Sequence, residues 1–162
     1  MMDVILGRGA VSFFDMEVQA FRIAVDATSG IMTRLIQQAD EELFRQRDRS
    51  RYEVIEKRSR EVDTMFGGTL RFKRRYYLDR ATGDRVFLLD EALALPGRAR
   101  HSPGLRALSV KLATSGSYRQ TRDAIEQMVG ARVMSHESVR QHVLTTGKVL
   151  EHLGRETAAQ PQ

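Results

Sequence analysis

The chain of 162 residues is long enough for one ordinary domain or two small modules, and its 41% hydrophobic and 29% charged residues are typical of a folded protein. Its formal net charge of +5 comes from basic residues that are mostly arginine, whose planar fork can donate two hydrogen bonds to one phosphate. The composition therefore favours a polyanionic partner, with a basic protein unrelated to nucleic acid as the alternative. Cysteine is absent, which excludes disulfides, thiolate zinc sites and a catalytic cysteine.

No apolar run approaches the roughly 20 residues of a membrane span. The apolar trio Val4 to Leu6 is too short for the apolar region of a signal peptide. We therefore expect a cytoplasmic protein without a membrane segment.

The first predicted element is a long amphipathic helix from Ser12, its N-cap, to about Arg47, with Asp15 completing a weak capping box. Ser29-Gly30 is its weak point, where we expect a kink or a division. Apolar residues in steps of four and three form a seam that permits a homodimer through this helix, with packing against the same chain as the alternative. The seam residues are Phe14, Val18, Phe21, Val25, Thr28, Met32, Leu35 and Ala39.

A boundary near Ser50 leads into three or four short antiparallel strands, connected by turns at Gly67-Gly68 and at Gly83. The last of these strands is "RVFLLD" at 85–90. In the strand before it, alternation predicts a core face of Leu70, Phe72 and Tyr76, shared with Arg74. The opposite face is cationic and would follow a phosphate backbone, or would protect a strand edge from aggregation. Its residues are Arg71, Lys73 and Arg75.

Three helices are predicted after Pro96-Gly97: Pro103 to Thr114 with Ser102 as cap, Tyr118 to Val129, and Ser135 to Leu150. The last two have the pattern of a helix-turn-helix, in which the leading residues of the second helix enter the major groove; an ordinary helical bundle is the alternative. The base-reading candidates are His136, Glu137, Arg140 and Gln141, of which Arg140 suits guanine best. The phosphate-binding candidates in these helices and the link between them are Arg119, Arg122 and Arg132.

The sequence holds no pattern of an active site. The histidines lack the helical spacing of three or four residues that would bring two imidazoles to one face, and neither a phosphate-binding glycine loop nor a nucleophile elbow is present. We therefore expect no catalytic residue, no metal site and no cofactor in this chain.

Several stretches together resemble a known family. "FKRRYY", "FLLDEAL", "SPGL" and "SHESV", within residues 45 to 145, resemble the N-terminal part of a bacterial insertion-sequence transposase of the ISLre type, a family also catalogued among uncharacterised conserved proteins. Related transposase groups carry a zinc ribbon where this hairpin lies, so the resemblance implies a ribbon without metal or thiols. It also implies double-stranded DNA, the terminal repeats of an insertion sequence, as the partner.

The resemblance places the chemistry of DNA recombination in a later ribonuclease-H-like core, where three carboxylates hold magnesium. Because the sequence given ends at Gln162, we expect a truncated transposase that binds DNA and is not an enzyme by itself. The alternatives are a small dimeric DNA-binding regulator or transposition inhibitor, and an RNA-binding or structural module. The predicted fold is α+β and mostly α. Its parts are an N-terminal helical segment (1–50), a small antiparallel β module (51–100), a helix-turn-helix (101–154) and a disordered tail (155–162).

Overall fold

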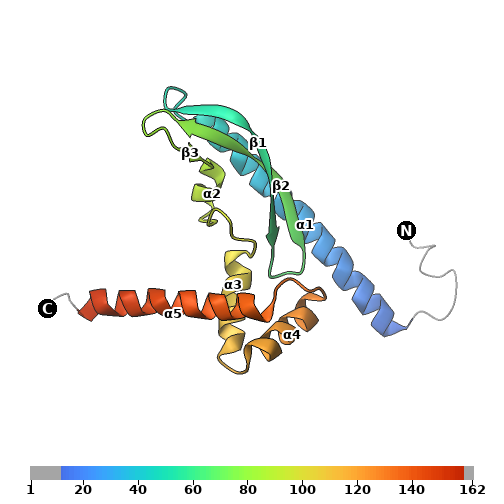
Figure 1. Cartoon of the computed structure of the whole chain (residues 1–162). Helices are drawn as coiled ribbons and strands as arrows, with labels where there is room; N and C mark the ends of the chain where they lie inside the picture. The colour runs from blue at the N-terminus through green and yellow to red at the C-terminus, as the bar shows by residue number, and fades with distance from the viewer. Residues whose placement is uncertain (1–11, 159–162) are drawn as a thin grey trace, which may run out of the picture.

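The computed structural model describes residues 12–158 and consists of a small antiparallel sheet that lies along a long N-terminal helix, with a group of three C-terminal helices at one end of the sheet (Figure 1). This confirms the mixed, mainly helical fold class. The predicted tail begins too early, because the last helix continues to Ala158; residues 159–162 lie outside the described part.

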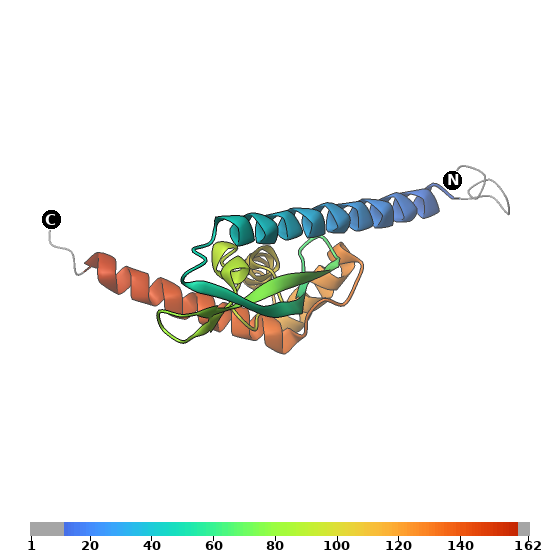
Figure 2. The ribbon, with the colours of Figure 1, turned by 90° about the horizontal axis from the view of Figure 1, so that it is seen from above.

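Helix α1 (Phe13–Gln46) is one unbroken helix of 34 residues (Figure 2). The predicted capping box is confirmed: the Ser12 hydroxyl accepts the Asp15 N–H at 3.1 Å, and the Asp15 carboxylate accepts the Ser12 N–H at 3.3 Å. The helix continues through Ser29-Gly30, so the expected kink or division is wrong. Gly30 is exposed with no atom within 4 Å of an added Cβ, and one glycine costs only about 1 kcal/mol in a helix of this length.

The sheet has the order β1-β2-β3, with β1 (Tyr52–Asp63) and β2 (Thr69–Asp79) forming a long antiparallel ribbon and β3 (Arg85–Val86) only two residues long. One register irregularity lies between Val54 and Glu56. Both predicted turns are present, with positive φ at Gly67 and Gly83, a conformation that glycine adopts at little cost. Of the three or four strands predicted, the sheet has three, because one strand, β1, fills the stretch before the first turn.

The predicted strand at 85–90 is wrong beyond Val86, because the chain turns into helix α2 (Leu88–Ala92). Successive side chains of a strand point to opposite faces. Leu89 and Asp90 are both buried, Leu89 in the apolar core and Asp90 against the arginines of the sheet. A helical turn lets both side chains reach the same layer.

Two apolar clusters form the core. The first joins Ile36 of α1 to Val62, Leu70 and Phe72 of the sheet and to Leu89 of α2. The second lies among α3 (Pro103–Ala113), α4 (Tyr118–Val129) and α5 (His136–Ala158). These helices begin and end close to the predicted positions, except that α5 continues eight residues beyond Leu150. Its buried members are Leu105, Ile125, Val129, Met134 and Val139.

Asp63 connects the sheet to the helical group. Its backbone N–H donates to the carbonyl of Arg100 at 2.7 Å, and its carbonyl accepts the N–H of Ser102 at 2.9 Å. Its carboxylate accepts hydrogen bonds from the Arg100 guanidinium at 3.0 Å and the Thr69 hydroxyl at 2.7 Å. The segment that leads into α3 is therefore attached to the end of β1 by main-chain and side-chain bonds.

Candidate nucleic-acid interface

The first turns of α5 carry the four predicted base-reading side chains on one exposed surface. Ser135 caps the helix as predicted, its hydroxyl accepting the Ser138 N–H at 3.1 Å. Val139, on the opposite side, is fully buried in the second core. The exposed tip is thus held on a packed scaffold. It consists of His136, Glu137, Arg140 and Gln141.

Glu137 is the centre of the polar contacts at this tip. One of its carboxylate oxygens accepts a hydrogen bond from Gln141 at 3.0 Å and one from Arg140 at 2.9 Å. These bonds, that of Gln141 first, hold the pKa of Glu137 below its ordinary value. In the free protein the Nη1 of Arg140 is therefore paired with a carboxylate, while the side chain stays 48% exposed.

The predicted phosphate-binding arginines of α4 and the α4–α5 link differ in their surroundings. Arg119 and Arg132 are exposed, and neither forms an ion pair with any side chain that the structure describes. Arg122 is partly buried and donates to the adjacent Asp123, its Nε at 2.8 Å from the carboxylate. Arg119 and Arg132 are thus available cations, whereas Arg122 is already paired.

On the hairpin, Arg71 and Lys73 are exposed as predicted. Arg71 lies opposite Glu61 on β1, with its Nε 2.9 Å from that carboxylate, and Lys73 lies opposite Ser59. Two cations and one carboxylate therefore share this stretch of the sheet surface.

The prediction that Arg75 belongs to the exposed cationic face is wrong. Its side chain is only 9% exposed, and its Nη1 lies 2.6 Å from the carboxylate of Asp40 on α1. Its Nη2 lies 2.6 Å from Glu41. Alternation along β2 fails to predict this because α1, distant in sequence, packs against β2 at this point and supplies both carboxylates.

A second buried ionic cluster, missed by the sequence analysis, lies beneath the sheet. Arg60 donates to the carboxylate of Asp90 at 2.5 Å and to the carbonyls of Pro96 and Ala99. Arg74 contacts the same carboxylate, and its guanidinium lies 3.6 Å from the centre of the Phe87 ring. Burial, with the nearby charges of Arg60 and Arg58, lowers the pKa of Arg74 to about 10. The only sequence signal was Arg74 on the predicted core face.

Within residues 12–158, no group of three or more histidine, aspartate or glutamate side chains is placed to hold a metal ion. In the same part of the chain, no helix is both long and apolar enough to cross a membrane.

Comparison with known proteins places this chain in a family that is described as uncharacterised. The model of the Uncharacterised protein family UPF0236 matches residues 7–160, so the chain belongs to this family. A curated relative, "UPF0236 protein in vanSb 3'region" from Streptococcus gallolyticus, is 29% identical over 142 residues. That match covers 87% of this chain but only 30% of the relative. No solved structure matches the chain. The comparisons confirm the uncharacterised family; the transposase assignment stays a prediction.

Proposed function

We propose that this chain is the DNA-binding N-terminal portion of a transposase, which recognises the terminal repeats of an insertion sequence. The observation that carries the proposal is the tip of α5, where His136, Glu137, Arg140 and Gln141 are exposed while Val139 fixes the helix in the core. A rigid helix that presents donors and acceptors at its N-terminal end is the arrangement by which helix-turn-helix proteins read the major groove.

Two further observations support a phosphate-binding surface around this tip. Arg119 and Arg132 are exposed without an ion pair to any described side chain, and Arg71 and Lys73 add exposed cations on the hairpin. Contacts of this kind would position the protein on a duplex without reading its sequence. The net charge of +5 adds a general attraction to DNA.

The proposal assigns no catalytic step to these residues. The chain spans about 30% of the length of the curated relative that it matches. Under the proposal, DNA cleavage and strand transfer, with the magnesium ions that they require, belong to a ribonuclease-H-like core in the remaining part of such a longer protein.

The test is the binding of the full chain to duplex DNA over a salt series, first with a pool of randomised duplexes and then with a sequence selected from it. About five cations on phosphates predict a slope of roughly −4 to −5 in log K against log salt. Arg140→Ala should reduce the preference for the selected over a scrambled duplex by about 5- to 150-fold. Arg132→Ala should weaken both duplexes equally. A flat salt response would overturn the proposal.

The second candidate is a small dimeric DNA-binding regulator or transposition inhibitor without enzymatic activity. The observation that favours it is the exposure of large apolar side chains along the first half of α1, including Phe13, Phe14 and Ile23. Such a protein would bind the same DNA ends as a homodimer through the N-terminal helix. Sedimentation of the chain without DNA tests the dimer separately from DNA binding.

A further inference from the structure

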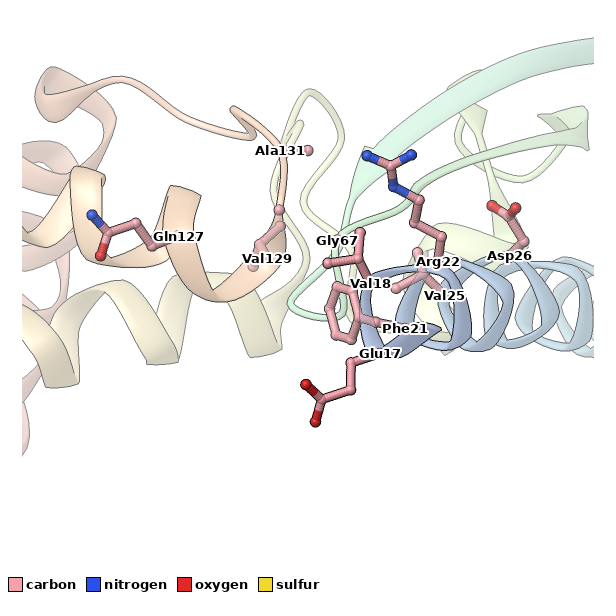
Figure 3. A pocket seen from close by; sticks show the side chains of 11 residues that line it. Glu17, Val18, Phe21, Arg22, Val25, Asp26, Gly67, Gln127, Val129 and Ala131 are labelled. Atoms are coloured by element: carbon pink, nitrogen blue, oxygen red, sulfur yellow. The ribbon is translucent and has the colours of Figure 1, made fainter. Parts of the chain in front are cut away.

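The first half of α1 carries two apolar faces, of which one borders a groove against the rest of the chain. Val18, Phe21 and Val25, which belong to the predicted seam, line a groove of about 550 Å³ that also contains Gly67 and Val129 (Figure 3). Further along, Met32, Ile36 and Ala39 pack into the core beneath the sheet. Part of the predicted dimer seam is therefore used within the chain, whereas Phe14 and Leu35 of the same seam stay 70% and 55% exposed.

The other apolar face lies roughly opposite and was not predicted. Its members follow the three-four spacing of a helical seam over nearly three heptads, and at 100° per residue they fall within roughly 80° of the helix circumference. Phe13, Ile23 and Ile31 are 75%, 62% and 60% exposed. The second face of α1 consists of Phe13, Met16, Ala20, Ile23, Ala27 and Ile31, all of them exposed.

From this arrangement we infer that the second face of α1 is the contact surface for a second copy of the chain, with the two helices antiparallel. Exposed apolar surface of this extent is unfavourable in water, and packing against the same face of a second helix removes it from water. The alanines at 20 and 27 let two helix backbones approach closely at the middle of the contact, with larger side chains filling the space on either side.

The charges of α1 decide the orientation. Asp15 and Glu17 lie in its first turns, and Arg34 lies at the far end of the second face. A parallel pair would place the acidic turns of both copies at the same height. An antiparallel pair instead places each acidic end beside the partner's Arg34 and sets the two helix dipoles in opposite directions. In this register Ala20 faces Ala27 of the second copy, and Met16 faces Ile31.

The absence of cysteine allows a direct test of this geometry with introduced thiols. Ala20→Cys and Ala27→Cys proteins should each stay uncrosslinked alone under mild oxidation and form a disulfide when mixed. Seven residues separate positions 20 and 27, so like positions in an antiparallel pair lie about 10 Å apart along the axis. That distance exceeds the Cα separation that a disulfide allows, about 7 Å. A disulfide between two copies of the same variant, with none between the two different variants in the mixture, would overturn the antiparallel arrangement.

Sedimentation equilibrium of the full chain without DNA tests the surface itself. The unmodified chain should have the mass of a dimer, and Ala27→Glu, which buries a carboxylate in the seam, should have the mass of a monomer. Gln19→Glu places the same charge on an exposed part of α1 beside the second face and should stay dimeric. A monomeric unmodified chain would overturn the inference. The second face would then be covered by something other than a second copy, such as residues 1–11 or a further part of a longer protein. None of these outcomes depends on DNA binding.

Discussion

The carboxylate of Asp40 holds the guanidinium of Arg75 by its Nη1 at 2.6 Å and also accepts the backbone N–H of Arg75 at 3.1 Å. The first bond neutralises a buried cation. The second satisfies a donor on the stretch of β2 that lies beyond its short pairing with β3. One side chain of α1 thus attaches the helix to both the main chain and a side chain of the sheet.

Replacing Asp40 should therefore destabilise the protein strongly. Asp40→Ala leaves Arg75 in a buried position with Glu41 as its one remaining carboxylate among the described residues, beside the carbonyl of residue 40, and breaking a buried pair typically costs about 3–5 kcal/mol. Urea unfolding measures the loss. Glu42→Ala, on an exposed part of the same helix, is the control and should cost within about 0.5 kcal/mol. Equal stability of the two variants would contradict the importance of the pair.

The buried cluster beneath the sheet contains two cations, Arg60 and Arg74, and one carboxylate, Asp90. Substitutions of its members should therefore destabilise the protein to different degrees. Asp90→Ala leaves two buried guanidiniums without a counter-charge and should cost at least about 3 kcal/mol in free energy of unfolding. Arg74→Met keeps the apolar contact with Phe87, removes the like charge near Arg60 and should cost much less. A larger loss for Arg74→Met than for Asp90→Ala would contradict this account.

Gly67 combines a positive φ of 95° with a close approach to α4. An added Cβ would lie 2.5 Å from the carbonyl oxygen of Val129, so Gly67→Ala adds a clash to backbone strain of about 1–3 kcal/mol. Gly83→Ala, at a φ of 78° with nothing within 4 Å, tests the strain alone. Gly97→Ala has neither problem. Thermal unfolding should rank the losses in the order Gly67, Gly83, Gly97.

His142 should make stability depend on pH below neutrality. Its Nδ1 lies 2.8 Å from the hydroxyl of the fully buried Ser109, and its ring packs against that of His101. Burial, then the charges of His101 and Arg106, lowers the pKa of His142 to about 4. Between about 6.5 and 4 the unfolded chain binds more protons than the folded one, so stability falls as the pH falls through this range.

The free energy of unfolding between pH 7 and 5 tests this effect, because carboxylates in the unfolded chain titrate mainly below that range. His142→Gln should flatten the dependence in this window, leaving the contribution of His101, whose pKa burial also lowers. An unchanged slope in the variant would show that His142 does not carry the effect.

If α5 binds DNA as proposed, Glu137 should limit its affinity. Glu137→Gln removes a carboxylate that pairs with Arg140 and would repel phosphate. The variant should bind duplex DNA more tightly, with a salt slope steeper by up to about 0.9, which is one additional phosphate contact. Glu151→Gln removes the same charge from a later turn of α5 and should leave the slope unchanged. Weaker binding by Glu137→Gln would instead assign base recognition to the carboxylate.

Local signals predicted much of the fold. The serine caps at 12, 102 and 135 and the glycines at 67 and 83 act within a few residues of themselves, and each occupies the predicted type of position. The strand prediction was wrong at "FLLDEA" because a short apolar run fits a buried strand as well as a helix. Its helical form depends on Asp90 reaching arginines of the sheet.

For the candidate site too, the sequence predicted what depends on local pattern and missed what depends on distant residues. The exposed tip of α5 follows from helical periodicity, because Val139 marks the buried side. The burial of Arg75 depends on carboxylates that lie 34 and 35 residues earlier in the chain, and no local pattern contains that information. The same limit applies to α1, where sequence alone could not show which of two apolar faces the chain itself would cover.

The attachment at Asp63 has a consequence for any ligand that touches both the hairpin and α5. Hydrogen bonds from its N–H and carbonyl to the segment before α3 use peptide groups, which every residue type except proline provides in full. Substitutions near this point can change side chains without releasing the joint. Two surfaces joined in this way do not move independently, as they would on a flexible linker, so the distance between them is fixed. A long ligand that touches both surfaces must therefore either match this distance or bend.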